Sequence, residues 1–315
     1  MICFLITSVI SFNLMAPPVK RPYSQLTKIM SNIDWFNESI SIKPISKVVE
    51  VHEKNINYLV WGNEGKPGLF FIHGYSAHAH WWDFVAPAFL DNYSVVAIDL
   101  SGCGESEHRE EYSQEIYAEE IKAVCDDMNW SSADFISHSM GGSISLNATS
   151  IYPELFNSLT LLDSIVVLPP EKVRGFSSGN SMVRADFVYD DKESAMDSFR
   201  LIPPQPCNNE FLLKHIAFNS FKEREDGWLL KSDGKMMRSY KSKDLTDILM
   251  TAKCPINIVY GLMSQIFTQD ILDYTLYVGN IPEERVIGVP GTMHHLFVDD
   301  PLSVIDAIKK LIGEK

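Results

Sequence analysis

The sequence predicts an α/β fold with a mostly parallel sheet flanked by helices, and two observations support this prediction. From Lys47 onward, short β-rich runs alternate with longer segments of helical periodicity, a pattern typical of parallel strands joined by crossover helices. The runs Leu69–Ile72 and Val95–Ile98 are apolar throughout, as expected for central strands buried on both faces. A chain of 315 residues also suits one large domain with an insertion better than two independent domains.

The other expected elements follow one another along the chain. Residues 48–51 and 56–61 predict a hairpin that turns at 53–55. Residues 114–129 predict a helix, because their apolar side chains recur at helical spacing. Further strands are expected at 135–136, 159–162, 256–260 and 285–287.

The alternation of strands and helices lapses after Ser164. Five prolines interrupt helical segments in the following stretch, before a strand pattern resumes at Ile256. We therefore expect residues 167–245 to form a helical lid inserted into a core made of residues 47–166 and 246–315.

Residues 1–46 are expected to be an N-terminal extension. Within it, residues 2–16 are mostly apolar, but they lack the positive start of a secretory signal and fall short of the roughly 20 apolar residues that span a bilayer. An export signal or membrane anchor, a disordered extension, and a translation start at Met15 or Met30 all stay open. We expect contact with a membrane only if residues 2–16 are an anchor.

Composition and charge exclude several classes of protein. With 45% hydrophobic and 22% charged residues, the chain is neither disordered, collagen-like nor polytopic in a membrane. A net charge of −14 would repel DNA or RNA, so no nucleic-acid partner is expected. Five cysteines without a Cys-x-x-Cys pair are most simply free thiols in a reducing compartment, which favours a cytoplasmic location.

Ser139 is the candidate nucleophile. It stands in Ser137-His138-Ser139-Met140-Gly141-Gly142, between a short strand and a helix rich in small residues. A strand–turn–helix elbow needs small neighbours, because the turn forces strained backbone angles and brings the serine close to the helix. Ser137 departs from the G-x-S-x-G pattern, but serine is small enough to be tolerated there.

Two further segments complete the candidate catalytic set. His73-Gly74-Tyr75 follows an expected strand, so the backbone N–H groups of Tyr75 and Met140 are candidate oxyanion-hole donors. The loop with His294 and His295 follows the last expected strand and supplies an imidazole. A serine needs such a base within hydrogen-bond reach, and serine first with histidine last is one known order of the triad.

With these motifs, the chain resembles the α/β-hydrolases from about Val48 to Leu311. The resemblance includes Asp99-Leu100-Ser101-Gly102-Cys103-Gly104-Glu105-Ser106, similar to the family's D-x-x-G-x-G-x-S loop. It implies an eight-stranded sheet with a helical cap after the sixth strand, and no cofactor. It favours His294 over His295 as the base, because the family's histidine usually stands seven residues before a proline that opens the last helix, here Pro301.

The acidic member of the triad departs from the family's commonest pattern. Many members carry aspartate three residues after a glycine that follows the seventh strand, but here Gly261 leads to Ser264. The family's alternative position is the end of the sixth strand, where this chain has Asp163. We therefore assign Asp163 as the orienting acid, with Asp270 as the alternative.

The expected activity is hydrolysis of a small, fairly apolar carboxylic ester. The family's epoxide hydrolases and dehalogenases attack with aspartate at the elbow, whereas this chain has Ser139. Carbon–carbon bond, thioester and lactone hydrolysis stay open, as does a non-catalytic ligand receptor on the same scaffold. The sequence does not distinguish a monomer from a homodimer. Pocket residues are expected at His73, Trp82, His138 and His295.

No metal site is expected. The run His78-Ala79-His80-Trp81-Trp82-Asp83 superficially suggests one, but distant ligands at recognisable spacing are missing. We interpret it as a loop and a first helix with one tryptophan packed near the pocket.

Overall fold

The computed structural model describes residues 33–62, 65–173, 187–240 and 243–313. The apolar segment 2–16 and the candidate starts Met15 and Met30 lie outside the described residues, as does the stretch 174–186 of the expected lid.

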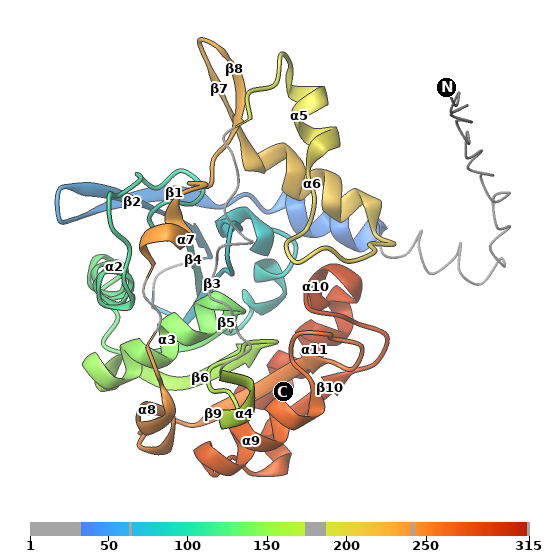
Figure 1. Ribbon diagram of the computed structural model, residues 1–315. Helices are drawn as coiled ribbons and strands as arrows, with labels where there is room; N and C mark the ends of the chain where they lie inside the picture. Colours follow the sequence, from blue (N-terminus) through green and yellow to red (C-terminus); the bar gives the residue numbers. More distant parts are fainter. Residues whose placement is uncertain (1–32, 63–64, 174–186, 241–242, 314–315) are drawn as a thin grey trace, which may run out of the picture.

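An eight-stranded sheet crosses the centre of the molecule in the order β1-β2-β4-β3-β5-β6-β9-β10 (Figure 1). Strand β2 is antiparallel to both β1 and β4, and every other neighbouring pair is parallel. The predicted α/β fold with a mostly parallel sheet is confirmed. The strands are β1 (Ile45–Val51), β2 (Lys54–Trp61), β3 (Gly68–Ile72), β4 (Ser94–Ile98), β5 (Ala133–His138), β6 (Phe156–Leu162), β9 (Ile256–Gly261) and β10 (Val286–Val289).

The central strands bury both of their faces. In β3, Phe70 and Ile72 pack into one apolar cluster, while Leu69 and Phe71 pack into the other. Helices α2 (Gln114–Asp127), α3 (Met140–Ile151), α8 (Thr246–Met250) and α9 (Gln269–Gly279) contribute to the first cluster. The helix over 33–41, the 3-10 helices η1 (Ala79–Trp82) and η2 (Ala86–Phe89), and the helices α10 (Leu296–Asp299) and α11 (Pro301–Ile312) contribute to the second.

Local capping fixes where the long helices begin. The Ser113 side chain accepts a hydrogen bond from the N–H of Ile116 and so starts α2. The Asp300 side chain accepts one from Ser303 at the start of α11, where Pro301 occupies the first helical position. The second cap places the end of the histidine loop directly against a long, well-anchored helix.

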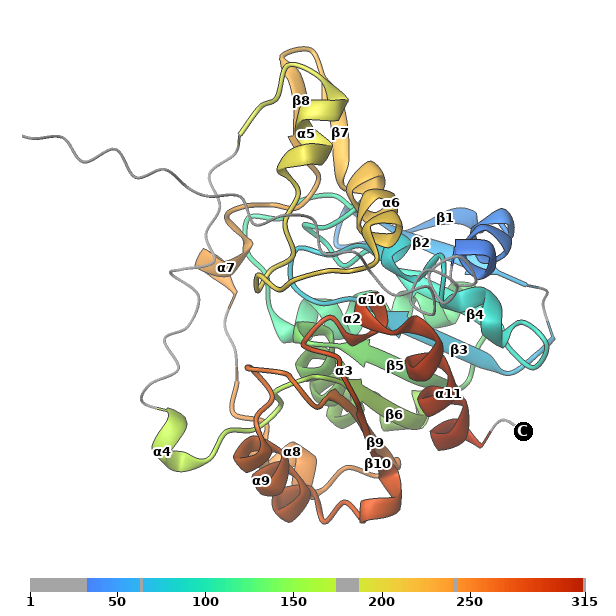
Figure 2. The same cartoon turned by 90° about the vertical axis from the view of Figure 1, so that its right-hand side faces the viewer.

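The segment between β6 and α8 is the expected cap, and its elements α5, α6, β7 and β8 project together to one side, whereas α4 lies near α9 (Figures 1 and 2). The expected helical cap after the sixth strand also contains a short antiparallel hairpin of β7 and β8. Gly227 permits the tight turn with a φ of 127°, and Tyr189 forms a β-bridge to Trp228. The cap elements are α4 (Pro170–Val173), α5 (Lys192–Ser198), α6 (Glu210–Ser220), β7 (Phe221–Arg224), β8 (Gly227–Leu230) and α7 (Met236–Ser239).

Within the part of the chain that the structure describes, no helix is both long enough and apolar enough to cross a membrane.

Candidate active site

Ser139 lies at the turn between β5 and α3 with backbone angles of φ 53° and ψ −121°. Such a φ is strained for a residue with a side chain, and the surrounding packing maintains it. A Cβ on Gly142 would lie 2.5 Å from Cβ of Ser164, so the helix can approach β6 only without a side chain at this position. Ser137, where the usual elbow has glycine, is fully buried and its hydroxyl lies 2.7 Å from that of Ser145. The departure from the pattern is therefore accommodated by a polar partner.

Ser139, His294 and Asp163 form a continuous hydrogen-bonded chain. Nε2 of His294 lies 2.9 Å from Oγ of Ser139, and Nδ1 of His294 lies 2.7 Å from Oδ1 of Asp163. The three residues follow β5, β10 and β6, whose carboxyl ends meet at one edge of the sheet. His294 is only 4% exposed and Asp163 is fully buried, so the chain of hydrogen bonds operates largely out of water.

The Asp163 carboxylate has further donors besides His294. Its Oδ2 accepts from the backbone N–H of Gly261 at 3.0 Å, and its Oδ1 accepts from the Ser264 hydroxyl at 2.8 Å. Such donors offset the cost of burying the carboxylate. The alternative acid, Asp270, lies elsewhere on α9, where its ion pair with Lys172 lowers its pKa. The structure thus brings Asp163, and not Asp270, to the histidine.

The backbone after β3 lies against the nucleophile. A Cβ on Gly74 would lie 3.0 Å from Cβ of Ser139, so the glycine lets this loop approach the serine closely. The loop turns at once, because the N–H of Ala77 donates to the carbonyl of Gly74 and Ser76 has a φ of 56°. The backbone immediately before Tyr75 therefore lies against the serine.

Two histidines next to the triad are held neutral. Burial keeps the pKa of His138 well below its usual value, and the nearby His294 lowers it further. Burial likewise lowers the pKa of His295 well below its usual value. Nε2 of His138 lies 3.0 Å from the carbonyl oxygen of His294, so a neutral His138 with its proton on Nε2 donates to the histidine loop. His138 thus supports the base through its backbone.

His73 serves the neighbouring loop. Its Nδ1 lies 2.7 Å from the carbonyl of Gly74, and its Nε2 accepts from the backbone N–H of Leu100 at 3.1 Å. Burial lowers the pKa of this imidazole, although Asp99 and Gly74 oppose the shift. His73 therefore ties the loop after β3 to the loop after β4.

None of the four expected pocket residues, His73, Trp82, His138 and His295, lines the small cavity beside Tyr75. That cavity has a volume of about 10 Å³ and is formed by core and cap together. Trp82 does not reach it, because its ring is buried between Phe71 and Phe297. Its neighbour Trp81 lines the cavity and packs on His295 at 5.5 Å between ring centres. The lining is Tyr75, Ser76, Trp81, Phe199, Arg200 and Ile202.

Hydrogen bonds from the cap hold the histidine loop, which sequence reasoning missed. Nε2 of Gln205 donates to Asp299 at 3.0 Å, and Oε1 of Gln205 accepts from the backbone N–H of His295 at 2.9 Å. Asp299 in turn accepts from the backbone N–H of Met293 at 2.7 Å. Burial raises the pKa of Asp299 to about 6, although the hydrogen bonds from Met293 and Gln205 oppose this. The base is therefore bracketed by bonds at the residues before and after it.

Among the described residues, no group of three or more histidine, cysteine, aspartate or glutamate side chains is arranged to hold a metal ion. In the run from His78 to Asp83, the Asp83 carboxylate instead bonds His80 of its own segment and His215 of α6. Those bonds lower the pKa of Asp83, against the opposing effect of burial. The cluster joins the core to the cap.

Comparison with known proteins agrees with this geometry. A family profile described as the alpha/beta hydrolase fold matches residues 67–198. A putative esterase/lipase from Haemophilus influenzae is 32% identical over 158 residues, which cover 49% of this chain and 54% of the relative. Epoxide hydrolase 4 of Homo sapiens is 31% identical over 110 residues, which cover 34% of this chain and 30% of the relative. The chain thus spans about half or less of these relatives.

Solved structures match over a longer stretch. An esterase from Mycobacterium tuberculosis superimposes with a TM-score of 0.71 at 20% identity, covering 90% of this chain and 98% of the esterase. At 20% sequence identity, the structural similarity supports the fold and nothing further. Together with the family profile and the strand order, it shows that the chain has the α/β-hydrolase fold.

Proposed function

We propose that the protein is a serine hydrolase that cleaves a small, fairly apolar carboxylic ester through an acyl-enzyme. The observation that carries the proposal is the hydrogen-bonded chain Ser139–His294–Asp163 at the carboxyl edge of the sheet. In the part of the chain that the structure describes, His294 is the histidine of this group that is hydrogen-bonded to a carboxylate, and that carboxylate stabilises the imidazolium as it forms. His138 and His295 stay neutral, so His294 is the group that can take up a proton.

The steps follow from this arrangement. Oγ of Ser139 attacks the ester carbonyl while Nε2 of His294 takes the hydroxyl proton. The resulting oxyanion is stabilised by the backbone N–H groups of Tyr75 and Met140. His294 then returns the proton to the leaving alcohol, and an acyl-enzyme remains on Ser139. Water, deprotonated by His294, attacks the acyl carbonyl and releases the carboxylic acid and the free serine.

A serine nucleophile also argues against epoxide hydrolysis as the reaction of this protein. Attack of a hydroxyl oxygen on an epoxide would leave an ether on Ser139, which water does not cleave under these conditions. Attack on an ester leaves an acyl group that water removes. The nucleophile therefore favours acyl transfer, despite the similarity to a relative named epoxide hydrolase.

The small cavity between core and cap is the candidate place for part of the substrate. Half of its six lining residues, Trp81, Phe199 and Ile202, are apolar, which suits a small, fairly apolar group. A volume of about 10 Å³ is close to the room that one water molecule needs. Entry of an ester therefore requires the cap residues 199–202 to move away from Tyr75.

The test combines active-site labelling with turnover. The wild-type protein should be labelled by a fluorophosphonate probe at Ser139 and should hydrolyse p-nitrophenyl esters, with the shortest acyl chains preferred. Ser139→Ala should abolish both, while keeping its fold by circular dichroism. A folded wild-type protein that is neither labelled nor active would indicate a non-catalytic ligand receptor. Thioester, lactone and dienoate substrates in the same panel establish which bond is cleaved fastest.

A further inference from the structure

A second cavity, of about 910 Å³, lies where the cap meets the core. Its walls come from the loop 108–112 of the core, from hairpin β7–β8, and from the segment 229–239 that contains α7 (Figure 1). None of the triad residues lines it, nor does any residue that lines the small cavity. We call this cavity the junction groove.

Basic residues are concentrated around the junction groove. Five of the thirteen residues that line it are lysine or arginine, against 27 of 315 in the whole chain. The chain as a whole carries a net charge of −14, so this is a positive region on an acidic protein. Such a concentration favours anionic ligands, because their charge is repelled elsewhere on the surface. The five are Arg109, Lys222, Arg224, Lys235 and Arg238.

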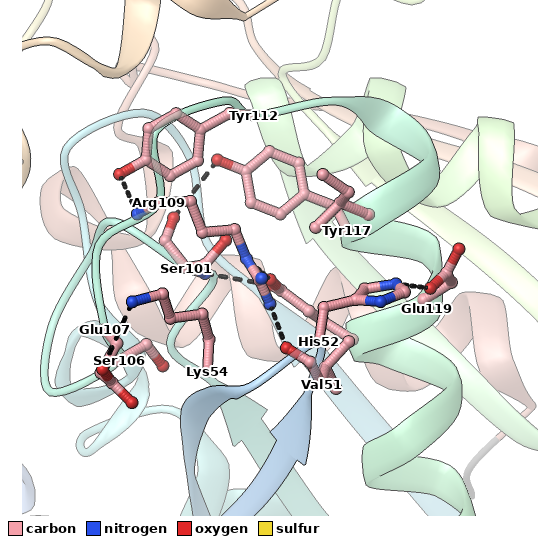
Figure 3. A network of polar contacts seen from close by, with 12 residues as sticks. Val51, His52, Lys54, Ser101, Ser106, Glu107, Arg109, Tyr112, Tyr117 and Glu119 are labelled. Atoms are coloured by element: carbon pink, nitrogen blue, oxygen red, sulfur yellow. Dashed lines mark hydrogen bonds and ion pairs between the residues drawn. The ribbon is translucent and has the colours of Figure 1, made fainter.

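Part of the groove wall is fixed before any ligand binds. Nε of Arg109 donates to the fully buried Glu120 at 3.0 Å, and its Nη2 donates to the carbonyl of Val51 at 2.8 Å (Figure 3). The Tyr112 hydroxyl accepts from the backbone N–H of Arg109 and donates to Asp233 at 2.6 Å. These bonds join the core loop to the cap segment, so the two walls hold a defined separation.

The remaining cations differ in how far they are neutralised. Arg109 is paired with Glu120, and Arg224 is paired with Asp226 outside the groove. Lys222, Lys235 and Arg238 have no ion-pair partner among the residues that the structure describes.

Two acidic residues, Glu110 and Asp233, also line the groove. The Asp233 carboxylate is already engaged, since it accepts from the Tyr112 hydroxyl and from the backbone N–H of Lys235. As far as the structure describes the chain, the groove therefore has three cations without an ion pair, against one acidic side chain, Glu110, that is not already hydrogen-bonded in this way.

We propose that the junction groove binds an anionic ligand through Lys222, Lys235 and Arg238, with a phosphate or a carboxylate group as the anion. Ammonium and guanidinium groups form charge-assisted hydrogen bonds with both kinds of oxygen. Leu229 and Leu230 supply an apolar wall for the rest of the ligand. The proposal stands whether or not the protein cleaves esters, because no triad residue takes part.

Binding of two simple anions tests the proposal. Full-length protein is titrated by isothermal calorimetry with inorganic pyrophosphate and, separately, with citrate, at 50 and 200 mM NaCl. We expect saturable one-to-one binding of at least one anion, weaker at the higher salt because the charges are screened. Saturation by pyrophosphate alone identifies a phosphate ligand, and saturation by citrate alone identifies a carboxylate ligand. No saturable binding of either anion at 50 mM NaCl overturns the proposal.

Variants locate the binding. Lys235→Glu/Arg238→Glu should raise the Kd about tenfold or more, because each charge reversal replaces an attraction by a repulsion. The matched control Lys253→Glu/Lys310→Glu makes the same change of net charge at two exposed positions outside the groove and should leave the Kd within about twofold. Equal weakening in both variants would assign the binding to net charge and overturn the proposal. Lys222→Ala, a milder change, should weaken binding without disturbing the fold.

Discussion

The serine and the histidine of the candidate site are positioned by two different kinds of structure. Ser139 is held by the backbone: a strand, a strained turn and a helix that packs against β6 without side-chain interference at Gly142. His294 is held by side chains that come from distant parts of the chain. Those side chains are Asp163, His138, Asp299 and Gln205.

This difference indicates which residue of the site depends least on side-chain hydrogen bonds for its position. The elbow depends on backbone geometry and on the close contact between Gly142 and Ser164. The histidine loop depends on hydrogen bonds to two carboxyl groups, an imidazole and an amide. Substitutions on the histidine side should therefore act on catalysis first, and substitutions around the elbow should act on stability first.

The largest effect is expected from removal of either reacting residue. His294→Ala and Ser139→Ala should each lower kcat by a factor on the order of 10⁶, because triad members act as a unit. For the same reason, the double variant should be no slower than either single one. Initial rates with the best p-nitrophenyl ester measure this, and a double variant that loses much more than the singles would show that the two residues act separately.

Asp163→Asn should lower kcat by about 10⁴-fold. The carboxylate faces three donors, from His294, Gly261 and Ser264, so an amide must turn its NH₂ group toward one of them in either orientation. His294 then loses the acceptor that fixes its tautomer. Asp270→Asn is the matched control and should keep activity within about twofold, since this exposed residue bonds Lys172 and Thr268 and not His294. The opposite ranking would make Asp270 the acid.

Gly142→Ala tests the elbow side of the comparison. The added methyl group would overlap Ser164, and we expect the free energy of unfolding to fall by about 1–3 kcal/mol. Urea unfolding measures the loss, and kcat per folded molecule should change less than in the Asp163 variant. Ser150→Ala, on the exposed side of the same helix, should cost less than about 0.5 kcal/mol. Similar losses in both variants would contradict close packing at Gly142.

Gln205→Ala should slow catalysis by up to about tenfold, because it removes hydrogen bonds worth roughly 0.5–1.5 kcal/mol each at the histidine loop. The effect should fall on kcat and on the rate of fluorophosphonate labelling more than on KM, since Gln205 acts through the base. Gln269→Ala is the control, as this residue bonds only the exposed Asp273. A loss confined to KM would place Gln205 at the substrate instead.

The smallest effect concerns pH. Because the pKa of Asp299 is raised to about 6, above its ordinary value of 3.8, the neutral carboxyl is favoured in the folded protein. Its contribution to stability is fully present below about pH 4 and is lost as the pH rises through 6. Asp299→Asn, neutral at every pH, should therefore gain in Tm relative to the wild type between pH 4 and pH 7. A constant Tm difference across that range would show that Asp299 does not titrate there.

Local patterns were sufficient to predict the fold and the position of Ser139. The unbroken apolar strands and the elbow around Ser139 are encoded within a few neighbouring residues, whereas the choice of His294 over His295 came from the resemblance to the α/β-hydrolases. Asp163 followed from a resemblance at the end of the sixth strand, where Ser264 made the commoner position unsuitable.

What escaped prediction depends on contacts between distant segments. Gln205 lies 90 residues before His295, in a proline-rich stretch that has no motif of its own. The hairpin β7–β8 has strands of only four residues, too short to show alternation. Trp81 and Trp82 differ only in the side of a 3-10 turn that they occupy, so their sequence does not tell which one faces the cavity. The junction groove combines cations from two regions of the chain that only folding brings together.

The hydrogen bond between Ser264 and Asp163 has an evolutionary consequence. The two side chains belong to neighbouring strand ends and already touch at 2.8 Å, so either position can deliver a carboxylate to the same imidazole. Exchange of the pair, Asp163→Ser with Ser264→Asp, would move one charge by one strand while keeping a hydroxyl as its neighbour. Two substitutions are therefore enough to move the acidic residue from one strand end to the other while the histidine stays unchanged. Related enzymes with the same reaction need not carry this acid at the same sequence position.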